Sequence, residues 1–212
     1  MDKEAKTRGI GVEEAQRGSR DAILRAAEER FAAAGLEGAS MREIAERVGI
    51  TKAALYYHFK GKEELWLAVC ERLASERMAA IRRAAASSPD PVVRLKNVIS
   101  EIVDRFFETP NLSLLIQRSL LDPDAERSRK VVEMAYSGAF GVFYELSGEL
   151  GVKTDRQLWA LHVAGMCIMP FEARGILPWL PGAGGSVFDP EHLKASIFRI
   201  LFPEGAESIR EG

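Results

Sequence analysis

The sequence is poor in the residues that build covalent or metal-bound scaffolds. Its 212 residues include only 2 Cys and 3 His. Two cysteines exclude a disulfide framework and give no zinc-ligand spacing, so we expect Cys70 and Cys167 to be free thiols on helices. We expect no metal and no cofactor. The 9 Pro and 18 Gly are too few for a collagen-like or linker protein.

Long hydrophobic runs and a strong charge of one sign are also missing. The longest apolar run, 158–171, contains His162 and is shorter than the ~18–20 residues that span a bilayer. No apolar segment follows the charged N-terminal residues, so we expect no secretory signal and a cytoplasmic location. With 29 basic and 31 acidic residues the net charge is −2. Any nucleic-acid contact must therefore come from a local patch.

What the sequence does contain is helical periodicity with capping residues. Apolar residues recur at helical spacing, whereas period-two alternation is scarce, so we predict an all-α fold of about nine helices. Ser19 is the expected N-cap of the first helix, Gly35 its end, and residues 1–18 a flexible arm. The pattern predicts helices over 20–34, 41–48, 52–59, 63–86, 91–108, 112–121, 125–150, 155–171 and 189–202, with a loop over 178–186.

The segment 40–62 has the form of a helix-turn-helix. Ser40 can cap its first helix, with Glu43 three residues later as in a capping box, and Thr51 can cap its second. Gly49 suits a turn residue with positive φ, and Ala45 is small where the two helices approach. A generic pair of short helices would show the same pattern, so the turn alone does not fix a function.

The charge of this segment favours contact with nucleic acid. Residues 47–62 contain no Asp or Glu and carry a formal charge of +4, against −2 for the whole chain. Such cations neutralise phosphates, and aromatic hydroxyl groups can bond phosphates or base edges. The alternative is a solvated basic face. The basic residues are Arg47, Lys52, Lys60 and Lys62, interleaved with Tyr56, Tyr57 and His58.

These residues resemble the DNA-binding signature of the TetR family of transcriptional regulators. The match covers about residues 19–66, and the remainder agrees only in length and helical pattern. Ala53 departs from the pattern, because the family often has Gly or Pro there. The matching residues are Ile23–Ala27, Phe31-Ala32, Gly35, Gly38–Ser40, Ile44-Ala45, Val48–Thr51, Leu55–Phe59 and Lys62–Leu65.

The resemblance implies that the helix 52–59 enters the major groove of DNA. Lys52 would then bond guanine O6 or N7, and the Ala53 methyl could pack on a thymine methyl. Ser40 and Thr51 could instead be plain helix caps, and His58 a packing residue. The residues expected to contact DNA are Ser40, Arg42, Thr51, Lys52, Ala53, Tyr56, Tyr57, His58 and Lys62.

Dimerisation is expected because a single helix-turn-helix reads only a few base pairs. Two copies on a two-fold axis read half-sites about 34–36 Å apart. The helix 155–171 is apolar nearly all round, so it needs cover on both sides. The family's last two helices typically form a four-helix dimer bundle; the alternative is a helix central to a monomer core. The expected interface residues are Trp159, Val163, Leu193, Ile197, Ile200 and Leu201.

The resemblance also implies an effector pocket between the middle helices, and the bulky residues there suggest an apolar or aromatic effector. The same residues could be ordinary core. Polar groups that could orient a ligand are Gln117, Arg118, His162, Glu172 and Arg174. The candidate ligand-binding residues are Phe106, Phe107, Tyr136, Phe140, Phe143, His162, Met166 and Met169.

Together these expectations describe a homodimeric, ligand-responsive repressor that binds double-stranded operator DNA and no membrane. Its parts would be the arm 1–18, a helix-turn-helix DNA-binding domain 19–66 and a helical effector-binding and dimerisation domain 67–212. Effector binding would shift the helix 63–86 and change the spacing of the two recognition helices. An enzyme is not expected, because no nucleophile motif, phosphate loop or catalytic carboxylate pair is present. A helical adaptor, a transcriptional activator and a structural nucleoid-type DNA binder are the remaining alternatives.

Overall fold

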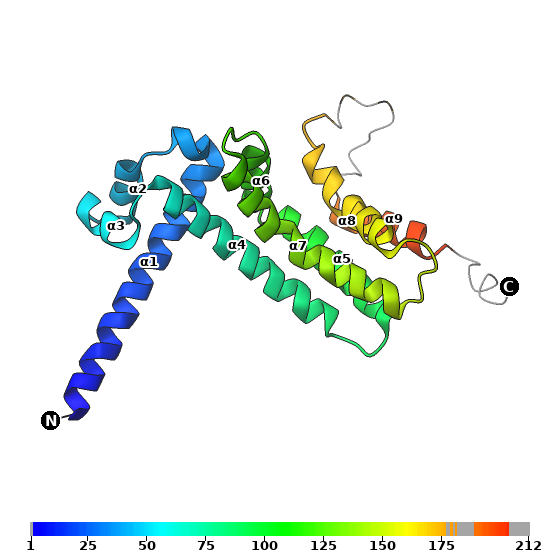
Figure 1. Cartoon of the computed structure of the whole chain (residues 1–212), viewed down its shortest axis with the longest axis horizontal. Helices are drawn as coiled ribbons and strands as arrows, with labels where there is room; N and C mark the ends of the chain where they lie inside the picture. Colours follow the sequence, from blue (N-terminus) through cyan, green and yellow to red (C-terminus); the bar gives the residue numbers. More distant parts are fainter. Residues whose placement is uncertain (1, 177–178, 180, 182–188, 204–212) are drawn as a thin grey trace. The chain divides into compact units, whose positions relative to one another are not determined.

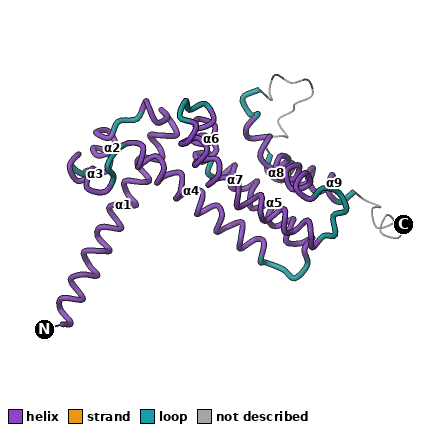
Figure 2. The backbone as a smooth tube through the Cα atoms, viewed as in Figure 1, coloured by secondary structure: helices purple, strands orange, loops and turns teal. Residues whose placement is uncertain are grey.

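The protein is all-α, as the sequence predicts. A computed structural model describes residues 2–176, 179, 181 and 189–203, and within these ranges it contains nine helices and no strand (Figures 1 and 2). The helices are α1 (Asp2–Gly38), α2 (Met41–Val48), α3 (Lys52–His58), α4 (Lys62–Ala85), α5 (Pro91–Glu108), α6 (Asn111–Leu120), α7 (Ala125–Glu149), α8 (Arg156–Glu172) and α9 (Pro190–Leu201).

The chain divides into two compact units, Met1–Leu73 and Ala74–Gly212. The first unit holds α1, α2, α3 and the first half of α4. Its core forms around the Phe31 and Trp66 rings, whose centroids lie 5.1 Å apart in an edge-to-face contact. The other large buried side chains of this core are Ile23, Leu24, Ile44, Leu55, Phe59 and Leu65.

The start of α1 differs from the prediction. The helix begins at Asp2, so the predicted N-cap at Ser19 is wrong, whereas the flexible arm predicted for residues 1–18 stays a prediction. Residues 2–17 are rich in Ala, Glu, Lys, Arg and Gln, which favour a helix, and extending an existing helix needs no new nucleus. The predicted break at Gly35 is confirmed, because φ there is 72°.

The second unit is built around α5, α7, α8 and α9. α8 packs against α7 and α5, and α9 packs against α5. Lys194 of α9 is buried and donates to Asp104 of α5 at 2.9 Å. The core residues are Ile81, Leu95, Val98, Ile99, Ile102, Val103, Phe106, Ala139, Phe143, Leu146, Ala160, Val163, Cys167, Phe171, Leu193 and Ile197.

Aspartate caps set the starts of four helices in this unit. Each carboxylate accepts backbone N–H groups of the first turn that have no partner inside the helix. Two of the four are followed by proline at the first helical position, which favours a helix start. The caps are Asp90, Asp124, Asp155 and Asp189.

α4 is a single helix that supplies residues 62–73 to the first unit and residues 74–85 to the second. It contains no glycine or proline. The predicted loop 178–186 lies outside the described residues except for 179 and 181. No helix of the described ranges is long and apolar enough to cross a membrane.

Candidate functional site

The turn between α2 and α3 has the geometry that the sequence predicts. Gly49 adopts a left-handed conformation with φ 78° and ψ 29°, and its N–H donates to the carbonyl groups of Ala45 and Glu46. Thr51 caps α3, since its Oγ1 accepts the Ala54 N–H at 3.1 Å. Gly49 therefore ends α2 and Thr51 begins α3, with one residue between the two caps.

The capping box predicted for α2 does not form. Ser40 is the N-cap, but its Oγ accepts the N–H of Arg42 at 3.2 Å. The Glu43 carboxylate instead accepts a hydrogen bond from Arg30 of α1 at 2.6 Å. Arg30 of α1 therefore binds the Glu43 carboxylate, which the sequence predicts to bond the backbone at the start of α2.

α3 places four of the expected DNA-contacting side chains on its exposed surface. Lys52, Ala53, Tyr56 and Tyr57 are exposed, and Tyr57 retains 76% of its accessible surface. The same helix anchors itself through Leu55, which is fully buried. Lys52 Nζ lies 5.6 Å from the centroid of the Tyr56 ring, so the cation and the aromatic ring form one patch.

His58 and the two N-caps lie at the margin of this patch. The His58 ring is half-buried and packs edge-on against Tyr57, with centroids 5.5 Å apart. Thr51 is exposed and Ser40 half-buried. Both hydroxyl groups act as helix N-caps, which is the structural alternative to DNA contact that the sequence leaves open for these two residues.

The basic side chains around α2 and α3 differ in whether they form an ion pair with an acidic side chain. Arg42 donates to Glu46 at 2.7 Å, and Lys62 lies 3.4 Å from the Glu37 carboxylate. Arg47 pairs with Glu29. Within the described part of the chain, Lys52 has no acidic partner.

Lys60 is in the same position as Lys52. Its side chain is exposed and forms no ion pair among the described residues, whereas its backbone N–H donates to Glu64 Oε2 at 2.7 Å. The sequence identifies it only as part of the basic excess, and the structure adds it to the candidate contacts.

The second unit contains a cavity of about 370 Å³ between α5, α7, α8 and the end of α4. Its size falls within the range of small-molecule sites. Four of the expected ligand-binding residues line it: Tyr136, Phe140, Phe143 and Met169. The other lining residues are Arg77, Ile102, Ala139, Leu161, Ala164, Gly165, Cys167, Ile168 and Glu172.

The other four expected ligand residues do not line this cavity. Phe106 stacks on Phe171 with centroids 4.6 Å apart, and Phe107 meets the same ring edge-on at 4.7 Å. Met166 is half-buried and His162 is exposed on α8. Phe106 and Phe107 therefore pack into the core against Phe171. Gln117, Arg118 and Arg174 also lie outside the lining, whereas Glu172 is part of it.

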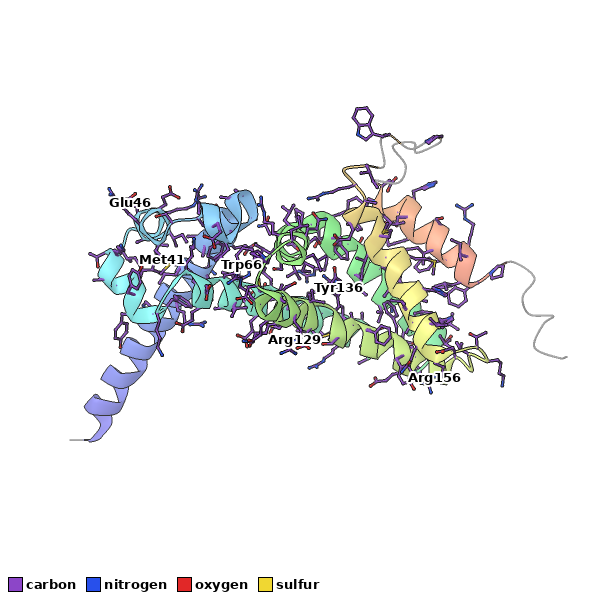
Figure 3. The ribbon with its side chains drawn as sticks, turned by 45° about the horizontal axis from the view of Figure 1, so that its top comes forward. Met41, Glu46, Trp66, Arg129, Tyr136 and Arg156 are labelled. Carbon is purple, nitrogen blue, oxygen red and sulfur yellow. The ribbon has the colours of Figure 1, made fainter. Side chains whose placement is uncertain are left out.

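The polar groups of the cavity are few and come from three helices. The Tyr136 hydroxyl, labelled in Figure 3, donates to Glu172 Oε1 at 3.5 Å. Burial raises the pKa of Tyr136 to about 12, so the hydroxyl stays protonated. Arg77 is 7% exposed, and its guanidinium carbon lies 4.6 Å from the centroid of the Phe106 ring. Burial lowers the pKa of this group.

Arg77 is the cavity residue that sequence reasoning missed. The signal was present, because Trp66, Cys70, Leu73 and Ala74 mark a buried stripe on α4. Arg77 follows at the next helical step of that stripe, where an apolar residue is expected. A charge at an apolar position of the pattern is therefore the feature to look for.

The expected dimer residues fall into two groups. Val163, Leu193 and Ile197 are buried in the core of this chain, so they do not form part of its outer surface. Ile200 is 64% exposed, and Trp159 and Leu201 are half-buried. A helix that is apolar all round does not reveal from its sequence which face is outermost.

The structure instead exposes an apolar face on α8. Leu158, Leu161 and Met169 follow at helical spacing and are each more than half exposed. Gly165 lies between them in the same register. Leu161, Gly165 and Met169 also line the cavity, so the open side of the cavity lies at this face. Among the described residues, no group of three or more His, Cys, Asp or Glu could hold a metal.

Comparisons with known proteins give this geometry a context. A family model described as "Bacterial regulatory proteins, tetR family" matches residues 23–69, which include the α2–α3 turn. The transcriptional repressor AcnR of Corynebacterium efficiens is 34% identical over 147 residues, which make up 68% of this chain and 74% of AcnR.

Two further similarities reach beyond the first unit. The transcriptional activator FasR of Mycolicibacterium smegmatis is 32% identical over 140 residues, or 65% of this chain and 63% of FasR, so the match spans less than two thirds of that relative. The crystal structure of AibR in complex with isovaleryl coenzyme A and operator DNA superposes with a TM-score of 0.68. That match covers 87% of this chain and 98% of AibR at 20% identity, so it shows a shared fold.

Proposed function

The chain belongs to the TetR family of DNA-binding transcriptional regulators, and from that premise we propose that it is a homodimeric repressor. It would bind a palindromic operator and release it when a small apolar or aromatic molecule fills the cavity. The single observation that carries the DNA contact is the exposed patch of α3, where Lys52, Tyr56 and Tyr57 have no acidic partner among the described residues.

The chemistry of this patch fits the major groove. Lys52 would donate to guanine O6 or N7, and the tyrosine hydroxyl groups would donate to phosphate oxygens. Lys60 and Lys62 would add phosphate contacts that carry no sequence information. Arg42 must exchange Glu46 for phosphate, which costs little because that pair is exposed.

A homodimer would be formed through the outer apolar face of α8 together with α9. Leu158 and Ile200 are large apolar side chains that are more than half exposed, which favours a partner surface. Two copies would place two α3 helices one duplex turn apart.

The effector would act through α4, which carries both Lys62 and the cavity residue Arg77. A ligand that prefers the conformation whose α3 helices mismatch the operator shifts the protein toward that conformation. A typical coupling of ~1–3 kcal/mol weakens DNA binding about 5- to 150-fold. AibR, which shares the fold, is named in complex with both an acyl coenzyme A and operator DNA.

The sign of regulation is proposed as repression. AcnR, matched over the larger share of this chain, is named a repressor, whereas FasR is named an activator. A reporter assay in which the protein is added to transcription from its operator decides between the two. Lower transcript yield supports the proposal, and higher yield contradicts it.

The test of DNA recognition uses fluorescence anisotropy on the DNA that flanks the protein's own gene, at two salt concentrations. We expect tight binding to one palindrome over a scrambled duplex. Tyr57→Ala should lose affinity for the palindrome while the melting temperature stays unchanged, because the side chain is exposed. Leu121→Ala truncates an exposed side chain of the second unit and serves as the control. Equal affinity of Tyr57→Ala and Leu121→Ala would contradict the assignment of α3.

A further inference from the structure

Arg77 is a buried cation that forms no ion pair within the described part of the chain. Its Nε and Nη2 atoms are buried and have no hydrogen-bond partner, and no ion pair within 4.0 Å joins it to an acidic side chain of the described residues. Its guanidinium carbon lies over the Phe106 ring, 4.6 Å from the ring centroid. A buried charge is normally paired and hydrogen-bonded, because its transfer out of water is costly.

The rest of the chain follows that rule. Lys194, which is equally buried, donates to Asp104 and also pairs with Glu191 at 2.6 Å. Arg127, with a side chain 12% exposed, binds Asp122. Arg77 is therefore an exception among the buried cations of this unit, and the exception lies on the wall of a cavity.

The two unsatisfied atoms of Arg77 form a recognition edge. The N–H bonds of Nε and Nη2 point the same way, at the spacing of the two oxygens of a carboxylate. Arg127 shows this arrangement in the same protein: its Nε donates to Asp122 Oδ2 and its Nη2 to Oδ1, each at 2.6 Å. Both atoms of Arg77 are buried in this structure, so a carboxylate in the cavity would reach this edge only after the side chain shifts.

The other residues that line the cavity favour a ligand that is apolar apart from its carboxylate. Ile102, Phe140, Phe143 and Ile168 contribute hydrocarbon surface, and the volume suits one small molecule. We propose that this cavity binds a monocarboxylate with an aliphatic or aromatic body, whose carboxylate pairs with the guanidinium group of Arg77 once that side chain turns toward it. The inference rests on the proposed effector site and specifies its ligand class.

Glu172 restricts the ligand to a single negative charge. Its carboxylate also lines the cavity and is held by the Tyr136 hydroxyl. A second anionic group near it would be repelled, so a dicarboxylate is disfavoured. The rival arrangement is that Glu172 neutralises Arg77 at longer range, in which case the cavity would take neutral ligands.

The test compares three compounds with the same chain length on the full-length protein at neutral pH. Octanoate, octanol and octylamine are titrated by isothermal calorimetry, with the rise in melting temperature as a second readout. We expect octanoate to bind at least about 10-fold more tightly than octanol, and octylamine more weakly than both. Equal affinity for octanoate and octanol would overturn the inference.

Variants then locate the preference. In Arg77→Met the advantage of octanoate over octanol should vanish, whereas Arg82→Met removes an exposed arginine of the same helix and should change nothing. Glu172→Gln should strengthen octanoate binding, because a repulsive charge is removed. A preference that survives Arg77→Met, or weaker octanoate binding to Glu172→Gln, would contradict the arrangement. The comparison of the three compounds on the unaltered protein does not depend on the folding of any variant.

The outcomes separate this inference from the proposed function. Octanol that binds as well as octanoate and releases DNA would leave the effector site standing and remove the role of Arg77. Octanoate that binds through Arg77 without changing DNA affinity would keep the ligand class and remove the proposed release mechanism. Failure of all three compounds to bind would overturn the inferred ligand class, whereas binding to the palindrome tests the proposed function independently.

Discussion

Lys62 Nζ, at the start of α4, lies 3.3 Å from the backbone carbonyl oxygen of Glu37 and 3.4 Å from its carboxylate. The Lys62 side chain is 27% exposed, whereas that of Glu37 is 90% exposed. An ion pair with such an exposed partner contributes about 0–1 kcal/mol. Lys62 can therefore leave Glu37 for a DNA phosphate at little cost.

The first prediction follows from this pair. Lys62→Ala should weaken binding to every DNA sequence and reduce the slope of log affinity against log salt by about one. Glu37→Gln should strengthen binding slightly at low salt, because Lys62 loses its competing partner. Anisotropy titrations over a range of salt concentrations measure both effects. Lys153→Ala is the control, and an unchanged slope in Lys62→Ala would show that Lys62 does not face phosphate.

The second prediction separates the two roles of Thr51. Thr51→Asp preserves the N-cap, because aspartate caps helices at least as well as threonine, so the melting temperature should hold. DNA affinity should fall, since a negative charge replaces a hydroxyl at the phosphate backbone. Thr51→Ala, by contrast, should lose about 1 kcal/mol of stability through the cap. Unchanged DNA affinity in Thr51→Asp would leave Thr51 as a cap only.

The third prediction concerns the outer apolar face of α8 and α9. Leu158→Arg and Ile200→Glu should each give monomers in size-exclusion chromatography with light scattering, and operator binding should be lost. Both side chains are exposed in the protomer, so its own fold should persist by circular dichroism. Val93→Arg places the same kind of change on α5 as a control. A stable dimer in both variants would show that the dimer interface is not formed by this face of α8 and α9.

The fourth prediction is an alkaline loss of stability. Burial raises the pKa of Cys70 and of Cys167 from 9.0 to about 12. Between these values the unfolded chain releases the thiol protons while the folded chain keeps them. The unfolding free energy should therefore be unaffected by these groups below about pH 9 and should fall as the pH rises toward 12.

Urea titrations at about pH 8 and about pH 10 measure that loss. A Cys70→Ala, Cys167→Ala variant should show a smaller difference between the two conditions. Native protein should also resist a thiol-labelling reagent at about pH 8 until urea is added, because the thiolate is the reactive form. Rapid labelling of both native thiols would contradict the burial that raises their pKa.

The parts of the fold that the sequence predicts are those decided locally. Gly49 and Thr51 act within a few residues of their own position, so the turn and the cap follow from residue type. Asp189 likewise starts the last helix through its own carboxylate. Glu43 shows the limit of such local prediction, because its carboxylate binds Arg30, which lies 13 residues earlier in the chain.

The parts that could not be predicted depend on which surfaces meet. α8 is apolar on every side, so nothing in its sequence distinguishes the buried Val163 from the exposed Leu161. The cavity has the same difficulty, since Phe106 and Phe140 are equally plausible lining residues until the stack of Phe106 on Phe171 is known. Hydrophobic periodicity therefore predicts where the helices lie in the sequence, but not which of their faces pack against one another.

The unbroken course of α4 makes it a lever. Lys62 and Arg77 lie fifteen residues apart on it, which is about 22 Å along the axis. With no glycine or proline between them to act as a joint, a tilt of about 5° at the Arg77 end moves Lys62 by about 2 Å. A phosphate contact of about 2.9 Å does not survive such a displacement. Under the proposed mechanism, a ligand that tilts α4 by this small angle would therefore be sufficient to release DNA.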